Sequence, residues 1–318
     1  MIKPLNIDQS ELKRFLENNY SLEILNLTFL PKGETSWCYI VEGRNGKYFL
    51  KVYKEMFPFL KEATELTYKL YSDCAITEIV HAIKAKNGET VNFFETYPTV
   101  LFNFVEGKEI MEQRLTDEQV KTFGKVLGRI HAATVKVGDY PKRETFESKD
   151  KEMFLKVVER IKQHEGNENS YQKQLVDLFM PKRERITQEL MHLEKLGRKL
   201  RAKNVPFVIC HGDPTGGNIL IDKDNKLYLV DWDNPILAPK ERDLLFFNNR
   251  MEPFMKGYAA IVGKVPIDFE AQQFYALEWN VQEVADFGER IFYQNNNDEQ
   301  NSHDLGRVAE FLDYSGIN

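Results

Sequence analysis

Short apolar runs separated by turn residues fill the first third of the chain. Their lengths and their content of β-branched and aromatic residues predict strands at 25–30, 37–41, 48–53 and 98–105. An Asn-Gly pair at 45–46 predicts a hairpin between two of these strands. Residues 7–20 and 59–72 place apolar side chains on one helical face, so we expect two amphipathic helices beside the strands.

The pattern becomes mainly helical after residue 116. Thr116 and Gln119 have the spacing of a capping box, and an amphipathic run follows them. Residues 150–203 are helix-rich and highly charged, and helical signals continue from Arg242 to the end. Two short apolar strands interrupt the helices, at 207–210 and 227–230.

This change of pattern predicts an α+β fold with two lobes. We expect a β-rich N-terminal lobe over residues 1–102 and a helical C-terminal lobe over residues 103–318. A chain of 318 residues with 42% hydrophobic residues is long enough to bury a core in each lobe.

The most informative order of polar residues lies within 208–243. An apolar strand ends in an H-G-D sequence at Asp213, and a glycine-containing loop leads from there to Asn218. After a hairpin, a second apolar strand ends in a D-W-D sequence that begins at Asp231. Single Asp-Gly or Asn-Gly pairs commonly mark turns, whereas this ordered set is much less expected by accident. The order therefore favours a functional site at the ends of the two strands.

These residue types suit phosphoryl transfer. The reaction needs a carboxylate beside the acceptor hydroxyl, and Mg²⁺ on the phosphates needs hard oxygen ligands. Asp213 fits the role of the base, and Asn218 and Asp231 fit the role of metal ligands. For His211 and for His131, which lies on an amphipathic helix, we expect structural roles: His211 fixes the catalytic loop through hydrogen bonds of its ring.

Composition excludes several other classes of protein. The net charge of −6 argues against a nucleic-acid partner, and no apolar run or signal-peptide pattern points to a membrane. Three scattered cysteines without metal-ligand spacing favour a reduced, cytoplasmic enzyme. From residue 266 onward, eleven acidic residues stand against two basic ones. Most of these acids are expected on a solvated surface, but some of them could line a pocket for a cationic substrate.

Over essentially its whole length, the chain resembles the aminoglycoside phosphotransferase and choline kinase superfamily. In that family the H-G-D-x4-N loop supplies the catalytic aspartate and one Mg²⁺ ligand, and the following aspartate supplies the second ligand. The resemblance implies these roles for Asp213, Asn218 and Asp231, and it implies a two-lobed protein-kinase-like fold. Many members have an apolar residue after H-G-D and a proline before Gly-Asn, whereas this loop reads D-P-T-G-G-N. The departure concerns the loop conformation, because the functional side chains are present.

The same resemblance implies a nucleotide site for ATP or GTP in the N-terminal lobe. Lys51 would contact the α- and β-phosphates and pair with Glu62, with Glu65 as the second candidate. A loop over the phosphates would include Gly33, Thr35 and Ser36. A hinge offering backbone groups to the base would include Asn103, Phe104 and Val105.

The acceptor is suggested by a more local likeness. The stretch from the D-W-D sequence through L-A-P-K-E-R-D-L is similar to that of spectinomycin phosphotransferases, which implies a cationic aminocyclitol acceptor and an antibiotic-resistance activity. Asp233, Glu283 and Asp286 are the candidates for contacts with ammonium groups. For the neighbouring Glu241, Arg242 and Asp243 we expect a structural ion-pair network under the metal loop.

Three alternatives remain open at this stage. A related chain could phosphorylate a metabolite such as choline, homoserine, methylthioribose or a sugar amine. A protein kinase is disfavoured because no A-P-E-like motif ends an activation segment. A nucleotide-binding pseudokinase is disfavoured because Lys51, Asp213, Asn218 and Asp231 are all intact.

Overall fold

The computed structural model describes residues 7–31, 35–111, 114–163, 169–294 and 297–313. The chain packs into two compact units and enters each of them twice. The first, which we call the mixed unit, comprises Met1–Arg143 and Phe207–Val265. The second, the helical unit, comprises Glu144–Pro206 and Pro266–Asn318. In the described ranges no helix is both long and apolar enough to cross a membrane.

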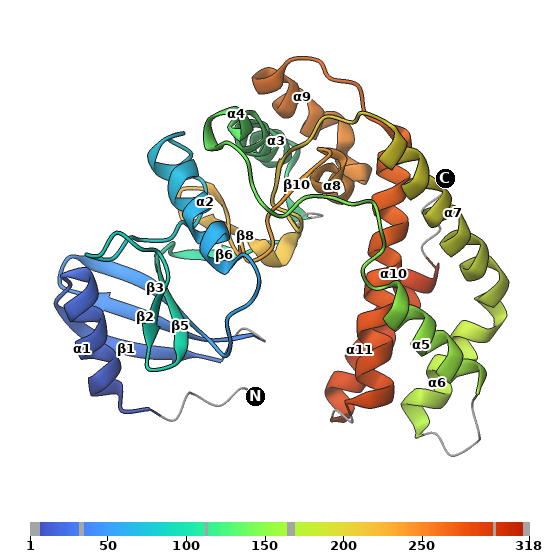
Figure 1. Cartoon of the computed structure of the whole chain (residues 1–318), viewed down its shortest axis with the longest axis horizontal. Coiled ribbons are helices and arrows are strands. Elements are labelled where there is room, and N and C mark those ends of the chain that lie inside the picture. Colours follow the sequence, from blue (N-terminus) through green and yellow to red (C-terminus); the bar gives the residue numbers. More distant parts are fainter. Residues whose placement is uncertain (1–6, 32–34, 112–113, 164–168, 295–296, 314–318) are drawn as a thin grey trace. The chain divides into compact units, whose positions relative to one another are not determined.

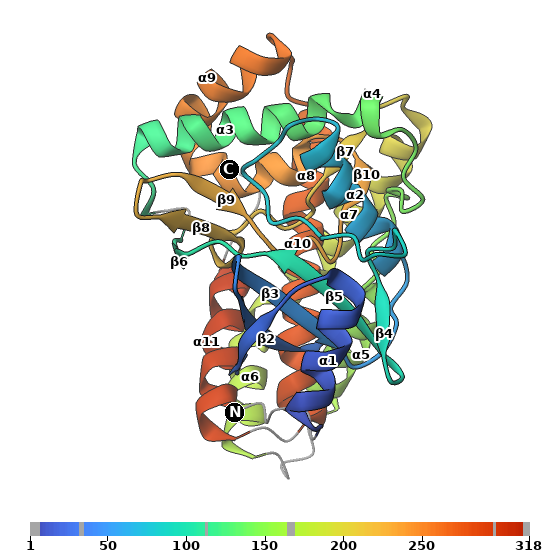
Figure 2. The same ribbon diagram turned by 90° about the vertical axis from the view of Figure 1, so that its left-hand side faces the viewer.

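An antiparallel five-stranded sheet forms the N-terminal part of the mixed unit, with strand order β1-β2-β3-β5-β4. Figure 2 labels its strands β2, β3, β5 and β4. Its strands are β1 (Ile24–Leu30), β2 (Ser36–Gly43), β3 (Gly46–Tyr53), β4 (Asn92–Phe94) and β5 (Tyr97–Asn103). The hairpin predicted at 45–46 joins β2 to β3, and Gly43 pairs with Gly46 at its end. In β3, Lys51 lies opposite Cys38 of β2 and Val100 of β5, so the sheet holds it on a central strand.

Helices and short strands complete the mixed unit (Figure 1). Its helices are α1 (Gln9–Tyr20), α2 (Leu60–Ser72), α3 (Asp117–Ala132), α4 (Thr134–Val137), α8 (Glu241–Leu244) and α9 (Met251–Val262). Its short strands are β6 (Gly107–Glu109), β7 (Val208–Cys210), β8 (Ile219–Asp222), β9 (Leu227–Leu229) and β10 (Ile236–Ala238). The predicted capping box is confirmed, because the Thr116 hydroxyl accepts from Gln119 N while the Gln119 side chain accepts from Thr116 N.

Glycines let α3 and α9 approach each other unusually closely. A Cβ atom at Gly257 would lie 1.8 Å from the Lys121 carbonyl oxygen, and one at Gly124 would lie 2.2 Å from that of Phe254. Any larger residue would force the two backbones apart. The close contact places residues of both helices in one buried core, which also contains Trp232 and Leu244 beside the site.

The helical unit is built around α10 (Phe269–Tyr293). Its other helices are α5 (Lys151–Lys162), α6 (Ser170–Phe179), α7 (Arg183–Ala202) and α11 (Asp298–Asp313), and each of them contacts α10. Twelve residues of α10 are buried, because neighbouring helices cover it on several sides.

The predicted α+β fold class is confirmed by the N-terminal antiparallel sheet and the helical C-terminal part. The compact units follow a different division from the predicted lobes, since strands from both predicted lobes belong to the mixed unit. The lobe boundary after residue 102 stays a prediction.

Candidate active site

The strand that leads to Asp213 is fixed by its pairing with the strand that follows the D-W-D sequence. β7 and β10 are antiparallel, with Cys210 opposite Ile236. Two residues after Cys210, Gly212 has a φ of 92°, a left-handed conformation that favours glycine. A Cβ atom there would also lie 3.1 Å from the Asn234 carbonyl oxygen. The glycine of the H-G-D sequence is therefore required by the turn that presents Asp213.

Asp243 of α8 fixes this turn through hydrogen bonds to its backbone. Its carboxylate is fully buried, and it accepts hydrogen bonds from His211 N at 2.9 Å and from Gly212 N at 2.8 Å. A third contact joins it to His131 Nε2 at 3.1 Å. Burial acts to raise the pKa of Asp243, but the interactions with His131, His211 and the Gly212 amide outweigh burial and lower it. The charged carboxylate thus anchors two consecutive amides just before Asp213, in agreement with a structural role.

Both histidines are engaged in structural contacts, as expected. His131 Nδ1 lies 2.8 Å from the Tyr258 hydroxyl, which links α3 to α9. His211 Nε2 lies 2.9 Å from the Val230 carbonyl oxygen, while its Nδ1 accepts from Asp213 N at 3.3 Å. A carbonyl oxygen only accepts, so His211 Nε2 donates to Val230. The His211 ring is fully used in holding the loop and has no nitrogen left to act as a base.

Asp213 keeps one carboxylate oxygen available. Asn218 Nδ2 donates to the Asp213 carbonyl oxygen at 2.9 Å and to Oδ2 at 3.1 Å. Oδ1 is buried and has no hydrogen-bond partner among the described residues. Burial, together with the charge of Asp231, raises the pKa of Asp213 against the opposing effects of His211 and Thr215. A positioned carboxylate with a raised pKa and an unused oxygen has the properties of a general base.

The D-W-D sequence turns both of its carboxylates toward β3. Asp231 has a φ of 62°, which is strained for a residue with a side chain, and Trp232 then points into the core. Lys51 Nζ lies 2.6 Å from Asp231 Oδ1 and 2.9 Å from Asp233 Oδ2. The Tyr53 hydroxyl donates to Asp233 Oδ1 at 3.0 Å. The structure therefore brings a cation and two acids together from segments about 180 residues apart.

The charges of this cluster depend on one another. Burial disfavours the Lys51 ammonium, but Tyr53 and the two carboxylates outweigh burial and raise its pKa well above the usual value. Burial also acts to raise the pKa of Asp231, yet Lys51 lowers it overall. For Asp233 burial prevails and, with the charge of Asp231, raises the pKa. Lys51 thus already compensates part of the negative charge that these acids would offer to a bound cation.

Glu62, the expected partner of Lys51, lies elsewhere. No ion pair joins it to Lys51 among the described residues, because Lys51 is held by Asp231 and Asp233. Glu62 instead lines a pocket beside α2, near Tyr140. The second candidate, Glu65, pairs with Lys84 at 3.0 Å. The expected Lys51–Glu62 pair is thus not formed in this structure, since the D-W-D acids take its place.

The predicted phosphate loop is only partly described. Gly33 lies outside the described residues. The Thr35 carbonyl oxygen accepts from Lys54 N at 3.0 Å, which ties the end of the loop to β3. Ser36 is buried, with its hydroxyl 3.6 Å from Cys38 Sγ.

The predicted hinge begins where β5 ends. Asn103 is the last residue of β5, and its Oδ1 accepts from His81 N at 2.7 Å. Phe104 and Val105 follow outside the named strands, and Lys47 Nζ lies 5.9 Å from the centroid of the Phe104 ring. The roles of the phosphate-loop and hinge residues stay predictions.

Two of the expected acceptor contacts belong to the helical unit. Glu283 and Asp286 lie three residues apart on α10 and therefore share a side of it. Burial raises the pKa of Asp286 to about 6, and the charge of Asp150 adds to this effect while Arg290 opposes it. Asp233, by contrast, is bound to Lys51 and Tyr53 in the mixed unit.

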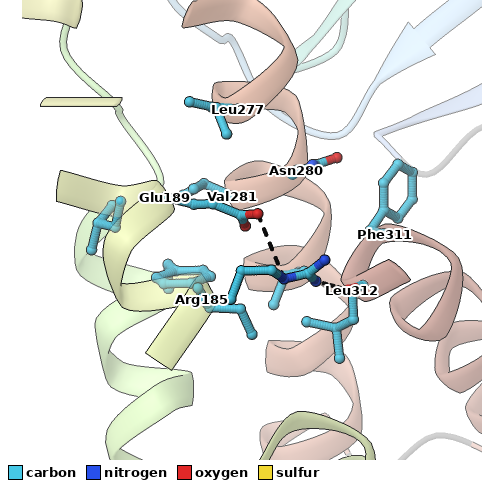
Figure 3. A pocket seen from close by; sticks show the side chains of 11 residues that line it. Arg185, Glu189, Leu277, Asn280, Val281, Phe311 and Leu312 are labelled. Atoms are coloured by element: carbon cyan, nitrogen blue, oxygen red, sulfur yellow. Dashed lines mark hydrogen bonds and ion pairs between the residues drawn. The ribbon is translucent and has the colours of Figure 1, made fainter. Parts of the chain in front are cut away.

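A small hollow in the helical unit faces a different side of α10 (Figure 3). Leu277, Val281 and Val284 line it from α10, and Arg185 and Glu189 of α7 enter it with their charged groups. The Arg185 Nε and Glu189 Oε1 atoms are 3.6 Å apart, and Arg185 Nη2 also donates to the Leu312 carbonyl oxygen. Its volume of about 20 Å³ is close to that of one water, so this hollow is not the acceptor site.

Sequence reasoning missed Tyr53 and Tyr258. Tyr53 follows Lys51 by two positions on β3, and this period-two spacing is the signal that could have placed both on one face. Tyr258 is one aromatic residue among many on a buried helix, and its bond to His131 depends on the close contact between α3 and α9. No local signal in the sequence points to it.

Comparisons with known proteins agree with this fold. A crystal structure of a spectinomycin phosphotransferase in complex with ADP and spectinomycin matches with a TM-score of 0.81 and 22% identity, covering 96% of this chain and 98% of that one. The choline kinase LicA from Streptococcus pneumoniae matches with a TM-score of 0.59 and 15% identity, covering 96% and 98%. Protein StrN of Streptomyces griseus is 22% identical over 322 residues, which cover 96% of this chain and 94% of StrN. At these identities the structural likeness establishes the fold.

A family model carries the assignment further. The model of the phosphotransferase enzyme family matches residues 26–244, which is more than half of the chain. The matched range contains Lys51 and all of the sheet except the start of β1, the loop from Asp213 to Asn218, and the D-W-D sequence. The chain therefore belongs to the phosphotransferase enzyme family.

Proposed function

We propose that this chain transfers the γ-phosphate of ATP or GTP to a hydroxyl of a small cationic acceptor, and that the acceptor is an aminocyclitol such as spectinomycin. The observation that carries the proposal is the unused buried oxygen of Asp213, held on a loop that Asp243 anchors. A carboxylate held in one position, with one oxygen that forms no hydrogen bond within the described residues, suits the role of a base that takes the proton of the acceptor hydroxyl. The setting we propose is the cytoplasm, where three cysteines that form no disulfide in the described part of the chain stay reduced.

The residues of the site fit a magnesium ion. The side-chain nitrogen of Asn218 donates to Asp213, so the side-chain carbonyl oxygen of Asn218 can coordinate a metal ion. The second ligand would be the carboxylate of Asp231, whose side chain is half-exposed. Carbonyl and carboxylate oxygens are the ligands that Mg²⁺ prefers. When bound, Mg²⁺ would neutralise charge on the transferred phosphate and orient it.

The remaining steps belong to the side chains. Asp213 Oδ1 accepts the proton of the acceptor hydroxyl while the hydroxyl oxygen of the acceptor forms a bond to the γ-phosphorus. The bond from this phosphorus to the β,γ-bridging oxygen breaks. The electron pair of the broken bond remains with the nucleoside diphosphate. Lys51 supplies a permanent positive charge for the phosphates, with Asp233 and Tyr53 fixing its position.

The choice of an aminocyclitol rests on charge and likeness. A structural neighbour was solved with spectinomycin bound, and the acids of the C-terminal part offer charge for ammonium groups. Glu283 and Asp286 are the proposed contacts. Asp233 is less suited to this role than expected, because Lys51 and Tyr53 already use both of its oxygens.

The experiment is a coupled assay of ADP release with Mg-ATP across a panel of acceptors. The panel contains spectinomycin, other aminoglycosides, choline, homoserine and methylthioribose. Strong stimulation by spectinomycin alone supports the proposal. Stimulation by a metabolite instead keeps the kinase mechanism and removes the aminocyclitol, while tight nucleotide binding without transfer to any of them favours a pseudokinase.

A further inference from the structure

A pocket of about 230 Å³ lies beside α2 in the mixed unit. One wall is the exposed side of α2 between Lys61 and Lys69, and the other is the segment 137–141 that follows α4. The two walls come from opposite sides of the predicted lobe boundary after residue 102. A ligand in this pocket would therefore touch both predicted lobes.

Most of the charged side chains around the pocket already have partners. The pairs are Lys61 with Glu89 at 2.5 Å, Glu65 with Lys84 at 3.0 Å and Asp139 with Arg143 at 2.6 Å. Glu62 and Lys69 are the two lining charges that form no ion pair within the described ranges. They lie seven residues, or about 10 Å, apart along α2. One end of the pocket thus carries an uncompensated negative charge and the other an uncompensated positive one.

Tyr140 adds an unpaired polar group at the negative end. Its side chain is only 4% exposed, and its hydroxyl has no hydrogen-bond partner among the described residues. Burial and the nearby charge of Glu62 raise its pKa, so the hydroxyl stays protonated. A buried hydroxyl without a partner is unfavourable, and a ligand that supplies one would relieve the cost.

We propose that this pocket binds a small organic monoamine, with its ammonium group between the Glu62 carboxylate and the Tyr140 hydroxyl. An ammonium group has three donors and suits two neighbouring acceptors. Leu66, Val137 and Pro141 offer apolar surface for the alkyl part. Lys69, two helical turns away, disfavours a second positive charge on the ligand. The volume lies below the range of about 300–1,000 Å³ for drug-sized ligands, which limits the ligand to a small molecule.

The test uses three probes of similar size on the full chain at constant ionic strength. Butylammonium is the monoamine, butan-1-ol is its neutral counterpart, and butane-1,4-diammonium is the dication. Amide chemical shifts report where each probe binds and how tightly. We expect butylammonium to shift residues of α2 and of 137–141 with a Kd on the order of millimolar, as is usual for so small a ligand. The alcohol is expected to bind at least tenfold more weakly, and the dication no more tightly than the monoamine.

Variants distinguish this site from general attraction to an acidic surface. Glu62→Gln should weaken butylammonium binding about tenfold or more, and Tyr140→Phe should weaken it about three- to tenfold. Asp139→Asn is the matched control, because it removes one negative charge from the same pocket but from a carboxylate that Arg143 already holds. Its effect should stay below about twofold.

Several results would overturn the proposal. They are tighter binding of the dication, equal binding of the alcohol, shifts away from α2 and 137–141, or equal losses in Glu62→Gln and Asp139→Asn. None of them bears on the kinase proposal, because binding at this pocket is measured without nucleotide or acceptor. Circular dichroism of each variant confirms that a loss of binding is not a loss of fold.

Discussion

A buried acid of the mixed unit and an acid of α10 have pKa values shifted in opposite directions. In the mixed unit, Asp243 is fully buried, yet three donors hold it and its pKa is lowered. In the helical unit, Asp286 is less buried, but its partners do not outweigh burial, which raises its pKa to about 6 with a further contribution from the like charge of Asp150. Depth of burial therefore does not decide the state of an acid; the partners arranged around it do.

This difference corresponds to two roles for a carboxylate, the positioning of a loop and the recognition of a cation. A carboxylate that positions a loop must keep one charge state and one set of hydrogen bonds. An acid whose charge is poorly compensated gains from any cation that approaches it, which suits recognition of an ammonium group. Asp213 stands between the two cases, because one of its oxygens is bound by Asn218 and the other has no partner among the described residues.

The largest expected effect comes from removing the unused oxygen. Asp213→Asn should lower the transfer rate by at least about a thousandfold, because an amide does not accept the proton. Nucleotide affinity, measured by calorimetry, should change little. Asp224→Asn, an exposed change in the turn after β8, is the matched control and should leave the rate unchanged. A rate within tenfold of wild type would remove Asp213 from the role of base.

The second effect tests whether Asp243 is structural. Asp243→Asn keeps the shape but loses the charge and sets an amide group against the donors of His211, Gly212 or His131. We expect a loss of about 3–5 kcal/mol in the free energy of unfolding, measured with urea, and a fall in transfer rate. An unchanged stability would mean that the loop has another anchor and would weaken the contrast with Asp286.

The third effect concerns the packing that supports this anchor. Gly257→Ala places a Cβ atom 1.8 Å from the Lys121 carbonyl oxygen, so α3 and α9 must separate. We expect a destabilisation of about 1–3 kcal/mol, with a loss of activity because His131 and Tyr258 lie on the separated helices. Gly306→Ala in α11 meets no atom within 4 Å and serves as control; it should be neutral or stabilise by up to about 1 kcal/mol.

The smallest effect concerns Asp286. Its pKa is raised in the folded chain, so wild-type stability should fall as the pH rises from about 4 to about 6 and stay level above that. Asp286→Asn removes this dependence. The variant should therefore have a higher free energy of unfolding than the wild type only above about pH 4. If Asp286 also binds the acceptor, the KM of the wild type should rise below about pH 6 and that of the variant should not. A variant with wild-type pH profiles would show that Asp286 does neither.

Much of the fold could be predicted because its signals are local. The short apolar runs, the Asn-Gly hairpin and the Thr116 capping box each depend on neighbours in the sequence. The partner of Lys51 does not depend on sequence neighbours. Glu62 and the D-W-D acids are all acidic candidates for this ion pair, and only the folded chain selects between them. Glu62 is instead part of the α2 pocket, where no motif indicates a role. Sequence order therefore singled out the loop from Asp213 to Asn218 but not its network of contacts.

The divided course of the chain has a consequence for synthesis. α5 and α7 leave the ribosome with apolar faces that α10 covers in the finished protein, yet α10 begins 67 residues after α7 ends. At about 5–20 residues per second, the apolar face of α7 waits roughly 3–13 s for α10, and that of α5, which ends earlier in the chain, waits longer. During that interval the apolar faces of α5 and α7 are open to chaperones, and fast translation of residues 203–268 would shorten their exposure.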